Sequence, residues 1–269
     1  MFLAFHGSIG AAASPPLPRP NPHHAVAPPT AAPVAPAPRD LASRVPDDIP
    51  VPRPKPQREV ATPSTPAGPA TTQSWVQPAI AEARAECDRL LAGLVMEAAP
   101  ADPIGREGSC GAPAPLVVST VGASRVRIEP PATVNCRMAA ALHQWVETRL
   151  QPAAERYLGE RVASLRNASS YACRSRNNVR GAKLSEHAFA NALDISAFTL
   201  ASGAVLTVKG EWSTLASLFG IDSKARFLTE VHKGACSEFT TVLGPRANRL
   251  HADHLHLDLA VRRYHEICE

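Results

Sequence analysis

The chain has 269 residues, and its 28 Lys and Arg against 24 Asp and Glu give a formal net charge of +4 at pH 7. The excess is divided evenly between the first 73 residues, with six basic and four acidic side chains, and the rest, with 22 and 20, so the chain lacks the basic surface of a nucleic-acid-binding domain. No run of 18 or more apolar residues occurs, which excludes an ordinary membrane span.

The N-terminal segment is rich in proline and alanine. Residues 1–70 contain 18 of the 27 prolines and show no hydrophobic periodicity, so this segment cannot bury enough apolar surface to offset the entropy of ordering. We predict a disordered, polyproline-like linker over residues 1–72. The first residues, MFLAFHGSIGAAAS, have the apolar and small residues of a secretory signal but no basic start, and are a possible remnant of an export signal.

The remaining residues, 75–269, have the patterns of a folded domain. Apolar residues from Ile80 to Leu94 recur at three- and four-residue spacing and predict an amphipathic helix. The segments APLVVST and SRVRIEP predict short strands. A second helix is expected to begin near Thr133 as N-cap, and Pro152 either breaks it or begins a further helix.

Later segments complete an α+β pattern. ALDISAFTLASGAVLTVKG predicts two strands joined by a hairpin turn at Ser202 and Gly203, followed by a helix over Ser223–Ala235. The chain closes with HLHLDLAVR as a strand. This order predicts a mostly antiparallel sheet with flanking helices.

Six dispersed cysteines all follow the predicted linker and form no CxxC pair. An even number of this kind favours three disulfides and an oxidising compartment, with six buried free thiols in a cytosolic protein as the alternative. Of the fifteen possible connectivities, we favour a local first pair and a staple near the C-terminus. The predicted pairs are Cys87–Cys110, Cys136–Cys268 and Cys173–Cys236.

Residues 251–258, HADHLHLD, concentrate three of the ten histidines. In an extended strand, His254, His256 and Asp258 share one face, while the intervening leucines share the other. The leucine face fits a core. The histidine face fits either a metal site, because neutral imidazole is a common zinc donor, or a hydrogen-bonded polar strand edge.

A second polar cluster, SSYACRSRNNVRGAKLSEHAFANALDI, places His187 and Asp194 seven positions apart. Together with His256 they supply two imidazoles and one carboxylate, the ligand count of a catalytic zinc site that keeps one position open for water. Asp194 alone would equally fit a turn or capping role.

At these residues the sequence resembles the bacterial extensin-like C-terminal domain family, over roughly Cys87 to Cys268. More distantly it is similar to the LAS metallopeptidases, which include lysostaphin-type enzymes, D-Ala-D-Ala carboxypeptidases, penicillin-insensitive murein endopeptidase and the hedgehog signalling domain. The shared pattern is SxHxxGxAxD followed later by HxH, and the matching residues here are Ser185, His187, Ala192, Asp194, His254 and His256. Ala190 departs from the pattern, because it stands where glycine is usual and a positive φ there would be strained.

The resemblance implies a LAS/hedgehog-like fold and Zn²⁺ held by His187, Asp194 and His256. It places His254 beside the water that zinc activates, either as a base or as a stabiliser of the oxyanion. Arg174, in the sequence YACR, matches an arginine suited to the carboxylate of a peptide stem.

Further roles stay open from sequence alone. His251 and Ser185 are candidate substrate-binding residues, with a solvent-exposed loop histidine as the alternative for His251. Asp258 either orients an imidazole or forms a strand-end salt bridge.

The expected function is therefore that of a zinc-dependent peptidase acting on peptidoglycan stem peptides or cross-links. The expected location is the periplasm or cell envelope, and the expected oligomeric state is a monomer. The alternative is a non-catalytic, zinc-containing wall-binding or scaffolding module, because fold resemblance alone does not prove hydrolysis.

Overall fold

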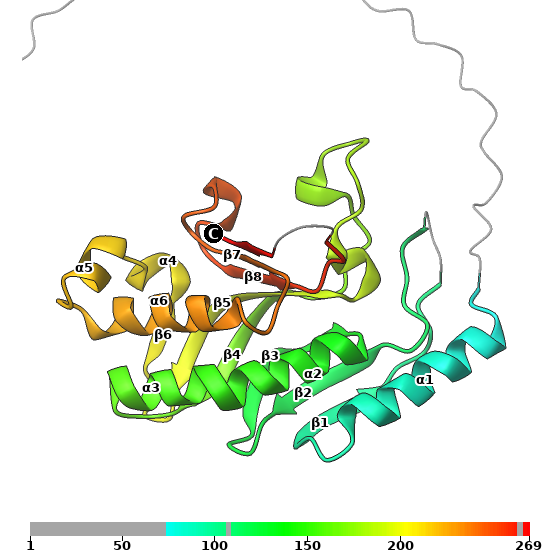
Figure 1. Cartoon of the computed structure of the whole chain (residues 1–269), viewed down its shortest axis with the longest axis horizontal. Helices are drawn as coiled ribbons and strands as arrows, with labels where there is room; N and C mark the ends of the chain where they lie inside the picture. The colour runs from blue at the N-terminus through cyan, green and yellow to red at the C-terminus, as the bar shows by residue number, and fades with distance from the viewer. Residues whose placement is uncertain (1–73, 106–108, 263–265) are drawn as a thin grey trace, which may run out of the picture. The chain divides into compact units, whose positions relative to one another are not determined.

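A computed structural model describes residues 74–105, 109–262 and 266–269 (Figure 1). The predicted linker, residues 1–72, and the possible export signal lie outside these described residues. The described part is an α+β domain with a mostly antiparallel sheet, as the sequence predicts. None of its helices is both long and apolar enough to cross a membrane.

The domain combines one sheet with helices and short helical turns. The strands are β1 (Met96–Pro100), β2 (Leu116–Val121), β3 (Val126–Val134), β4 (Val162–Ser169), β5 (Ala192–Leu200), β6 (Val205–Thr207), β7 (Thr241–Leu243), β8 (Leu255–Asp258) and β9 (Ile267–Cys268). The helices are α1 (Gln77–Leu91), α2 (Cys136–Trp145), α3 (Gln151–Leu158), α4 (Val208–Glu211), α5 (Thr214–Leu218) and α6 (Ser223–Ala235), and the turns are η2 (Val146–Leu150), η3 (Arg176–Asn178), η4 (Glu186–Phe189) and η5 (Arg249–His251).

The nine strands form one sheet in the order β1-β2-β3-β4-β5-β8-β7-β9, with β6 also paired to β5. Only β3 with β4 and β7 with β9 run parallel among the described strands. The β3–β4 connection runs through α2, η2 and α3, as a parallel crossover requires. Strands β5 and β8 are interior and almost wholly buried, so their polar side chains need partners within the protein.

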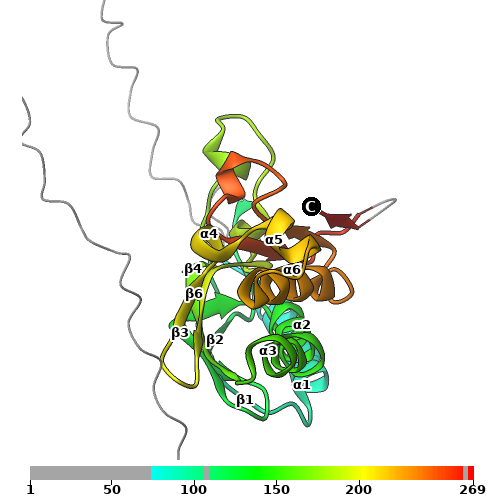
Figure 2. The ribbon, with the colours of Figure 1, turned by 90° about the vertical axis from the view of Figure 1, so that its left-hand side faces the viewer.

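The helices α1, α2, α3 and α6 lie on one face of the sheet (Figure 2). Trp145 at the end of α2 is fully buried, and its Nε1–H donates to the Val231 carbonyl of α6 at 3.1 Å. Phe198 of β5 packs edge-on against Phe227 of α6, with 5.4 Å between ring centroids. The first contact joins α2 to α6, and the second joins α6 to β5, the strand that carries Asp194.

Local sequence patterns predict most of these elements. The helix Ser223–Ala235 and the turn at Ser202 and Gly203 are confirmed, and Gly203 adopts the positive φ that a tight turn favours. Thr133 was wrongly predicted as an N-cap. It pairs with Val117 inside the sheet, and the side chain of Asn135 caps α2 by accepting from the Met138 N–H.

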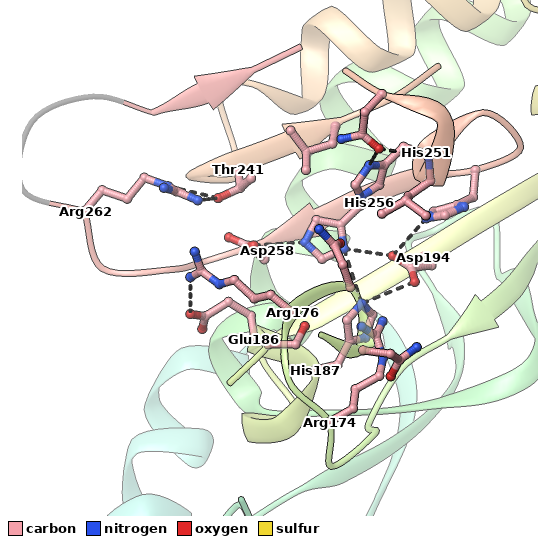
Figure 3. A pocket seen from close by; sticks show the side chains of 17 residues that line it. Arg174, Arg176, Glu186, His187, Asp194, Thr241, His251, His256, Asp258 and Arg262 are labelled. Carbon is pink, nitrogen blue, oxygen red and sulfur yellow. Dashed lines mark hydrogen bonds and ion pairs between the residues drawn. The ribbon is translucent and has the colours of Figure 1, made fainter. Parts of the chain in front are cut away.

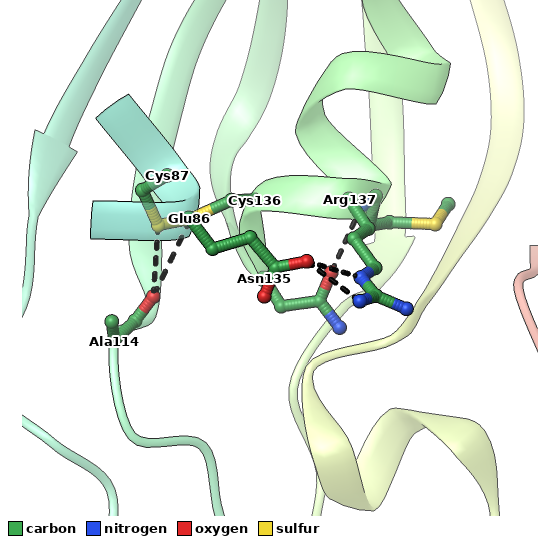
Figure 4. The surroundings of a disulfide bond; sticks show 7 residues. Glu86, Cys87, Ala114, Asn135, Cys136 and Arg137 are labelled. Carbon is green, nitrogen blue, oxygen red and sulfur yellow. Dashed lines mark hydrogen bonds and ion pairs between the residues drawn. A yellow bond between two sulfur atoms is a disulfide. The ribbon is translucent and has the colours of Figure 1, made fainter. Parts of the chain in front are cut away.

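The predicted three disulfides are present, but the predicted pairing is wrong. The observed pairs are Cys87–Cys136, Cys110–Cys173 and Cys236–Cys268, with Cα–Cα distances of 5.2–5.8 Å. Cys87 cannot pair locally, because α1 packs beside α2 and presents Cys87 to Cys136 (Figure 4). Three disulfides are typical of a protein exported to an oxidising environment.

Candidate metal centre

Three elements place the predicted ligands together. Strands β5 and β8 pair antiparallel with Asp194 directly opposite His256, so both side chains project from the same face of the sheet. The turn η4 brings His187 over this face (Figure 3). All three side chains are buried.

The three donor groups face one another at short range. His187 Nε2 lies 3.2 Å from Asp194 Oδ2 and 3.2 Å from His256 Nδ1, and His256 Nδ1 lies 2.8 Å from Asp194 Oδ1. Zinc bonds of about 2.0–2.1 Å in tetrahedral geometry separate neighbouring donors by roughly 3.3 Å. The cluster therefore fits zinc after a small outward adjustment.

Hydrogen bonds on the outer side of each imidazole fix which nitrogen faces inward. His187 Nδ1 lies 2.5 Å from the Ser170 carbonyl oxygen and must donate to it, which leaves a lone pair on Nε2. His256 Nε2 lies 2.9 Å from Asp258 Oδ2, which leaves Nδ1 for the centre when the ring is neutral. Two lone pairs and a carboxylate thus converge on one point, an arrangement that a cation stabilises.

When protons rather than a cation occupy the cluster, the inward nitrogens donate to Asp194, and the electrostatics show how strongly the carboxylates attract positive charge. Burial opposes the ionised form of Asp194, but hydrogen bonds from His187 and His256 hold the pKa of this carboxyl well below its usual range. Burial likewise opposes the charged form of His256, yet its hydrogen bonds to Asp194 and Asp258 raise the pKa of the imidazole to about 9. The pocket therefore favours positive charge between two carboxylates.

His254 lies beside the three donors but outside their group. Among the described residues, the ligand atoms of His187, Asp194 and His256 all lie within 4.8 Å of one another; His254 Nε2 lies 3.8 Å from Asp194 Oδ1 but does not meet this limit for all three. Its Nδ1 donates to Asp253 Oδ1 at 2.8 Å, so a neutral ring keeps a lone pair on Nε2.

His251 lies next to this ring. Its Nδ1 contacts Asn248 Oδ1 at 3.0 Å, and its ring centroid lies 5.2 Å from that of His254. Burial, together with neighbouring His256 and His254, lowers the pKa of His251 to about 4, so the ring is neutral near pH 7. The alternative of a solvent-exposed loop histidine is therefore wrong, because His251 is buried beside the cluster; its role in substrate binding stays a prediction.

Ala190 adopts the left-handed conformation, with φ of 53°, which the sequence pattern led us to expect to be strained at this position. It ends the η4 turn, and its N–H donates to the His187 carbonyl at 3.2 Å. Its own carbonyl accepts from the Asn135 N–H at 2.6 Å. The strained backbone of this residue is thus held by hydrogen bonds on both sides, and it fixes the turn that carries His187.

The cluster forms the floor of a cleft of about 370 Å³. Predicted residues Arg174 and Ser185 line it, and so do Arg176 and the Asn177-Asn178 pair of η3. Figure 3 shows Arg174 beside His187, while Arg176 contacts Glu186 at 3.9 Å. The four candidate residues for catalysis and substrate binding, Arg174, Ser185, His251 and His254, therefore all line the cleft together with the three predicted ligands.

Comparison of the sequence with protein families gives a match to the family described as extensin-like protein C-terminus, over residues 85–269. The chain belongs to the extensin-like C-terminal family. A search of curated proteins gave no match, and a search of solved structures gave none either. The fold and site of this extensin-like domain are therefore interpreted from its own geometry.

Several hydrogen-bond partners of the histidines in this extensin-like domain were not predicted from the sequence. Asp253 binds His254, and Asn248 binds His251. The position of Asp253 directly before His254 could have indicated this contact. A carboxylate next to a histidine in a loop is too common to predict a hydrogen bond between them. The Ser170 carbonyl carried no signal, because any residue type supplies a carbonyl.

Asp258 resolves the choice left open by the sequence, because its carboxylate both contacts His256 and accepts from the Ala260 N–H at 3.0 Å. It therefore orients an imidazole.

A second group of possible ligands, His232 with Cys236 and Cys268, is not a thiolate site, because the two cysteines form a disulfide.

Proposed function

We propose that this extensin-like domain is a zinc-dependent peptidase that cleaves an amide bond in the stem peptides or cross-links of peptidoglycan in the periplasm or cell envelope. The observation that carries the proposal is the convergence of His187 Nε2, Asp194 and His256 Nδ1 on one point at the floor of a cleft, with His254 outside this group. The similarity to LAS peptidases in the ligand pattern points the same way.

The donor set matches that of catalytic zinc sites, which have three protein ligands and leave a position for water or substrate. Zinc bound by His187, Asp194 and His256 would lower the pKa of water and polarise the scissile carbonyl. The ligands are positioned by their outer hydrogen bonds to Ser170 and Asp258, so little reorganisation accompanies binding.

The Asp253–His254 pair supplies proton transfer in this proposal. Asp253 accepts from Nδ1 and so orients the ring, although its carboxylate is more exposed than the buried one of a catalytic triad. His254 Nε2 then receives a proton from the attacking water and delivers it to the amine that leaves. The His254 side chain lines the cleft, and its Nε2 lies 3.8 Å from Asp194 Oδ1.

The upper wall of the cleft is suited to an anionic peptide. Arg174 and Arg176 face the cleft beside the buried cluster, and a guanidinium binds a carboxylate with two parallel hydrogen bonds. Peptide stems of the wall carry such carboxylates. Asn177 and Asn178 offer amide groups for the peptide backbone.

Digestion of purified sacculi by the zinc-loaded full-length protein, followed by identification of the released muropeptides, tests the proposal. The expected product is a shortened stem or a cleaved cross-link, and the product is lost on chelation of zinc and restored on its return. Zinc-loaded protein that leaves sacculi intact but binds them would favour the wall-binding module. In that case His251 or His254 is expected to complete the coordination, since both rings lie beside the cluster.

A further inference from the structure

Helix α5 and the turn after it present an exposed apolar surface. Its four large side chains, Leu215, Leu218, Phe219 and Ile221, are between 69 and 78 % exposed. Single exposed apolar residues are common, whereas four within seven positions concentrate exposed apolar surface on one short segment, as interaction sites do. We define these four residues as the α5 patch.

The backbone beneath the α5 patch is ordered. The Ser213 hydroxyl accepts from the Ala216 N–H at 3.2 Å, the Phe219 N–H donates to the Leu215 carbonyl at 3.1 Å, and the Ile221 N–H donates to the Ala216 carbonyl at 3.0 Å. The apolar side chains are therefore held outward by a hydrogen-bonded turn that packs beside α6. The chain exposes them although its core has a separate, complete set of apolar residues.

The α5 patch projects from the domain. Figure 1 shows α5 at the edge of the domain, beyond the end of α6, and Figure 2 shows it on the helix-covered side next to α4. A short turn that projects from the edge of the domain and carries four exposed apolar side chains suits insertion into a lipid interface, whereas a stable protein partner typically covers roughly 800 Å² of each surface.

Cationic side chains border the α5 patch. Lys209 of α4 and Lys224 of α6 are exposed on the flanking elements, and the Arg226 guanidinium lies within 3.8 Å of the Cβ position of Gly220. Two carboxylates, Asp222 and Glu211, lie on the same elements and keep their charge while they accept from the Lys224 and Thr207 N–H groups. Three cations against two carboxylates leave this border with a net positive charge, which complements anionic lipid headgroups.

We propose that the α5 patch is a docking surface for an anionic membrane, in which Leu215, Leu218, Phe219 and Ile221 enter the lipid interface and the bordering cations contact the headgroups. The inference extends the proposed function but stands without it, because it uses none of the residues of the cleft. Strand β6 and α4 join the patch to β5, which carries Asp194. Docking would therefore hold the cleft at a fixed distance from the membrane surface.

Co-sedimentation of the full chain with vesicles tests the proposal. Wild-type protein is expected to bind vesicles that contain phosphatidylglycerol, to bind phosphatidylcholine vesicles much more weakly, and to release on addition of 0.5 M salt, roughly as screening of headgroup charge requires. The double variant Leu218→Ser/Phe219→Ser should lose about tenfold or more in partitioning. Lys209→Gln and Lys224→Gln should each lose about fivefold on anionic vesicles only.

The matched control removes two exposed apolar side chains outside the patch, Val76→Ser with Val95→Ser, and should bind as wild type does. Equal vesicle binding by the patch variant and the control would overturn the proposal. The proposal would also be overturned if the wild-type protein bound no vesicles and light scattering showed it to be a dimer, while the patch variant was a monomer. Zinc content and sacculus digestion are measured in parallel, so failure of membrane docking is distinguishable from failure of the proposed peptidase function.

Discussion

The Cys110–Cys173 disulfide should support the proposed zinc site as well as the fold. Both sides of this cross-link contact the turn that carries the first ligand, since the Gly111 N–H donates to the Ala188 carbonyl at 2.8 Å and the Ala172 N–H donates to the His187 carbonyl at 3.1 Å. The double variant Cys110→Ala/Cys173→Ala removes the covalent link between the two segments, at Gly111 and at Ala172, that contact the turn around His187. The Cys87–Cys136 disulfide joins α1 to α2 instead (Figure 4).

The two cross-links have similar effects on the unfolded chain. Their sequence separations are 63 and 49 residues, and the chain-entropy relation gives about 4 kcal/mol of stabilisation for each. Each double variant should therefore lose about the same free energy of unfolding, measured by urea denaturation followed by circular dichroism. Their zinc affinities should differ.

Loss of Cys110–Cys173 is expected to weaken zinc binding about 10- to 100-fold, the usual effect of losing outer support for a ligand, as measured by competition with a chelator under conditions where the variant is folded. Loss of Cys87–Cys136 should leave the affinity within about twofold of wild type. Equal zinc affinities in the two double variants would refute the reasoning, because they would show that the His187 turn is held without the disulfide.

Three further predictions concern separate parts of the domain. Asp258→Asn should retain the fold, because Oδ1 still accepts from the Ala260 N–H, but weaken zinc binding about 10- to 100-fold in a chelator titration, because His256 loses its carboxylate. Burial lowers the pKa of His232, so below about pH 6.5 the unfolded chain binds a proton that the folded chain does not bind. The stability that depends on this difference is complete above that pH and is lost as pH falls toward the lowered pKa. His232→Gln should therefore reduce the difference in urea midpoint between pH 7 and pH 5. A fragment that begins at Ser74 should keep the zinc stoichiometry and urea midpoint of the full chain, because every ligand and cysteine follows that point; lower values for the fragment would show that the proline-rich segment is needed.

The sequence was a good guide where one element determines the pattern. The leucine and histidine faces of β8 follow from the alternation of a strand, and α6 follows from helical spacing between an N-cap at Asp222 and its end at Ala235. Alternation also places His256 on the same face as Asp258, and the two side chains are in contact.

Long-range pairing could not be predicted in the same way. The disulfide partners depend on how α1 lies against α2, and short strands such as β1 and β7 carry too few residues for a periodic signal. Likewise, the ligand set drew on a motif resemblance, but the outer contacts depend on the backbone carbonyl of Ser170, which no side-chain pattern encodes. Tertiary packing decides these features.

The central claim is that three residues hold zinc while His254 moves the proton. It is tested most directly by zinc analysis of His254→Ala beside His187→Ala, Asp194→Ala and His256→Ala, each assayed on sacculi. The account predicts that the three ligand variants lose zinc and stability together, since metal binding is linked to folding, whereas His254→Ala keeps near-stoichiometric zinc and loses about 10²- to 10⁴-fold in turnover. Zinc loss in His254→Ala, together with no hydrolysis by the wild-type protein, would contradict it.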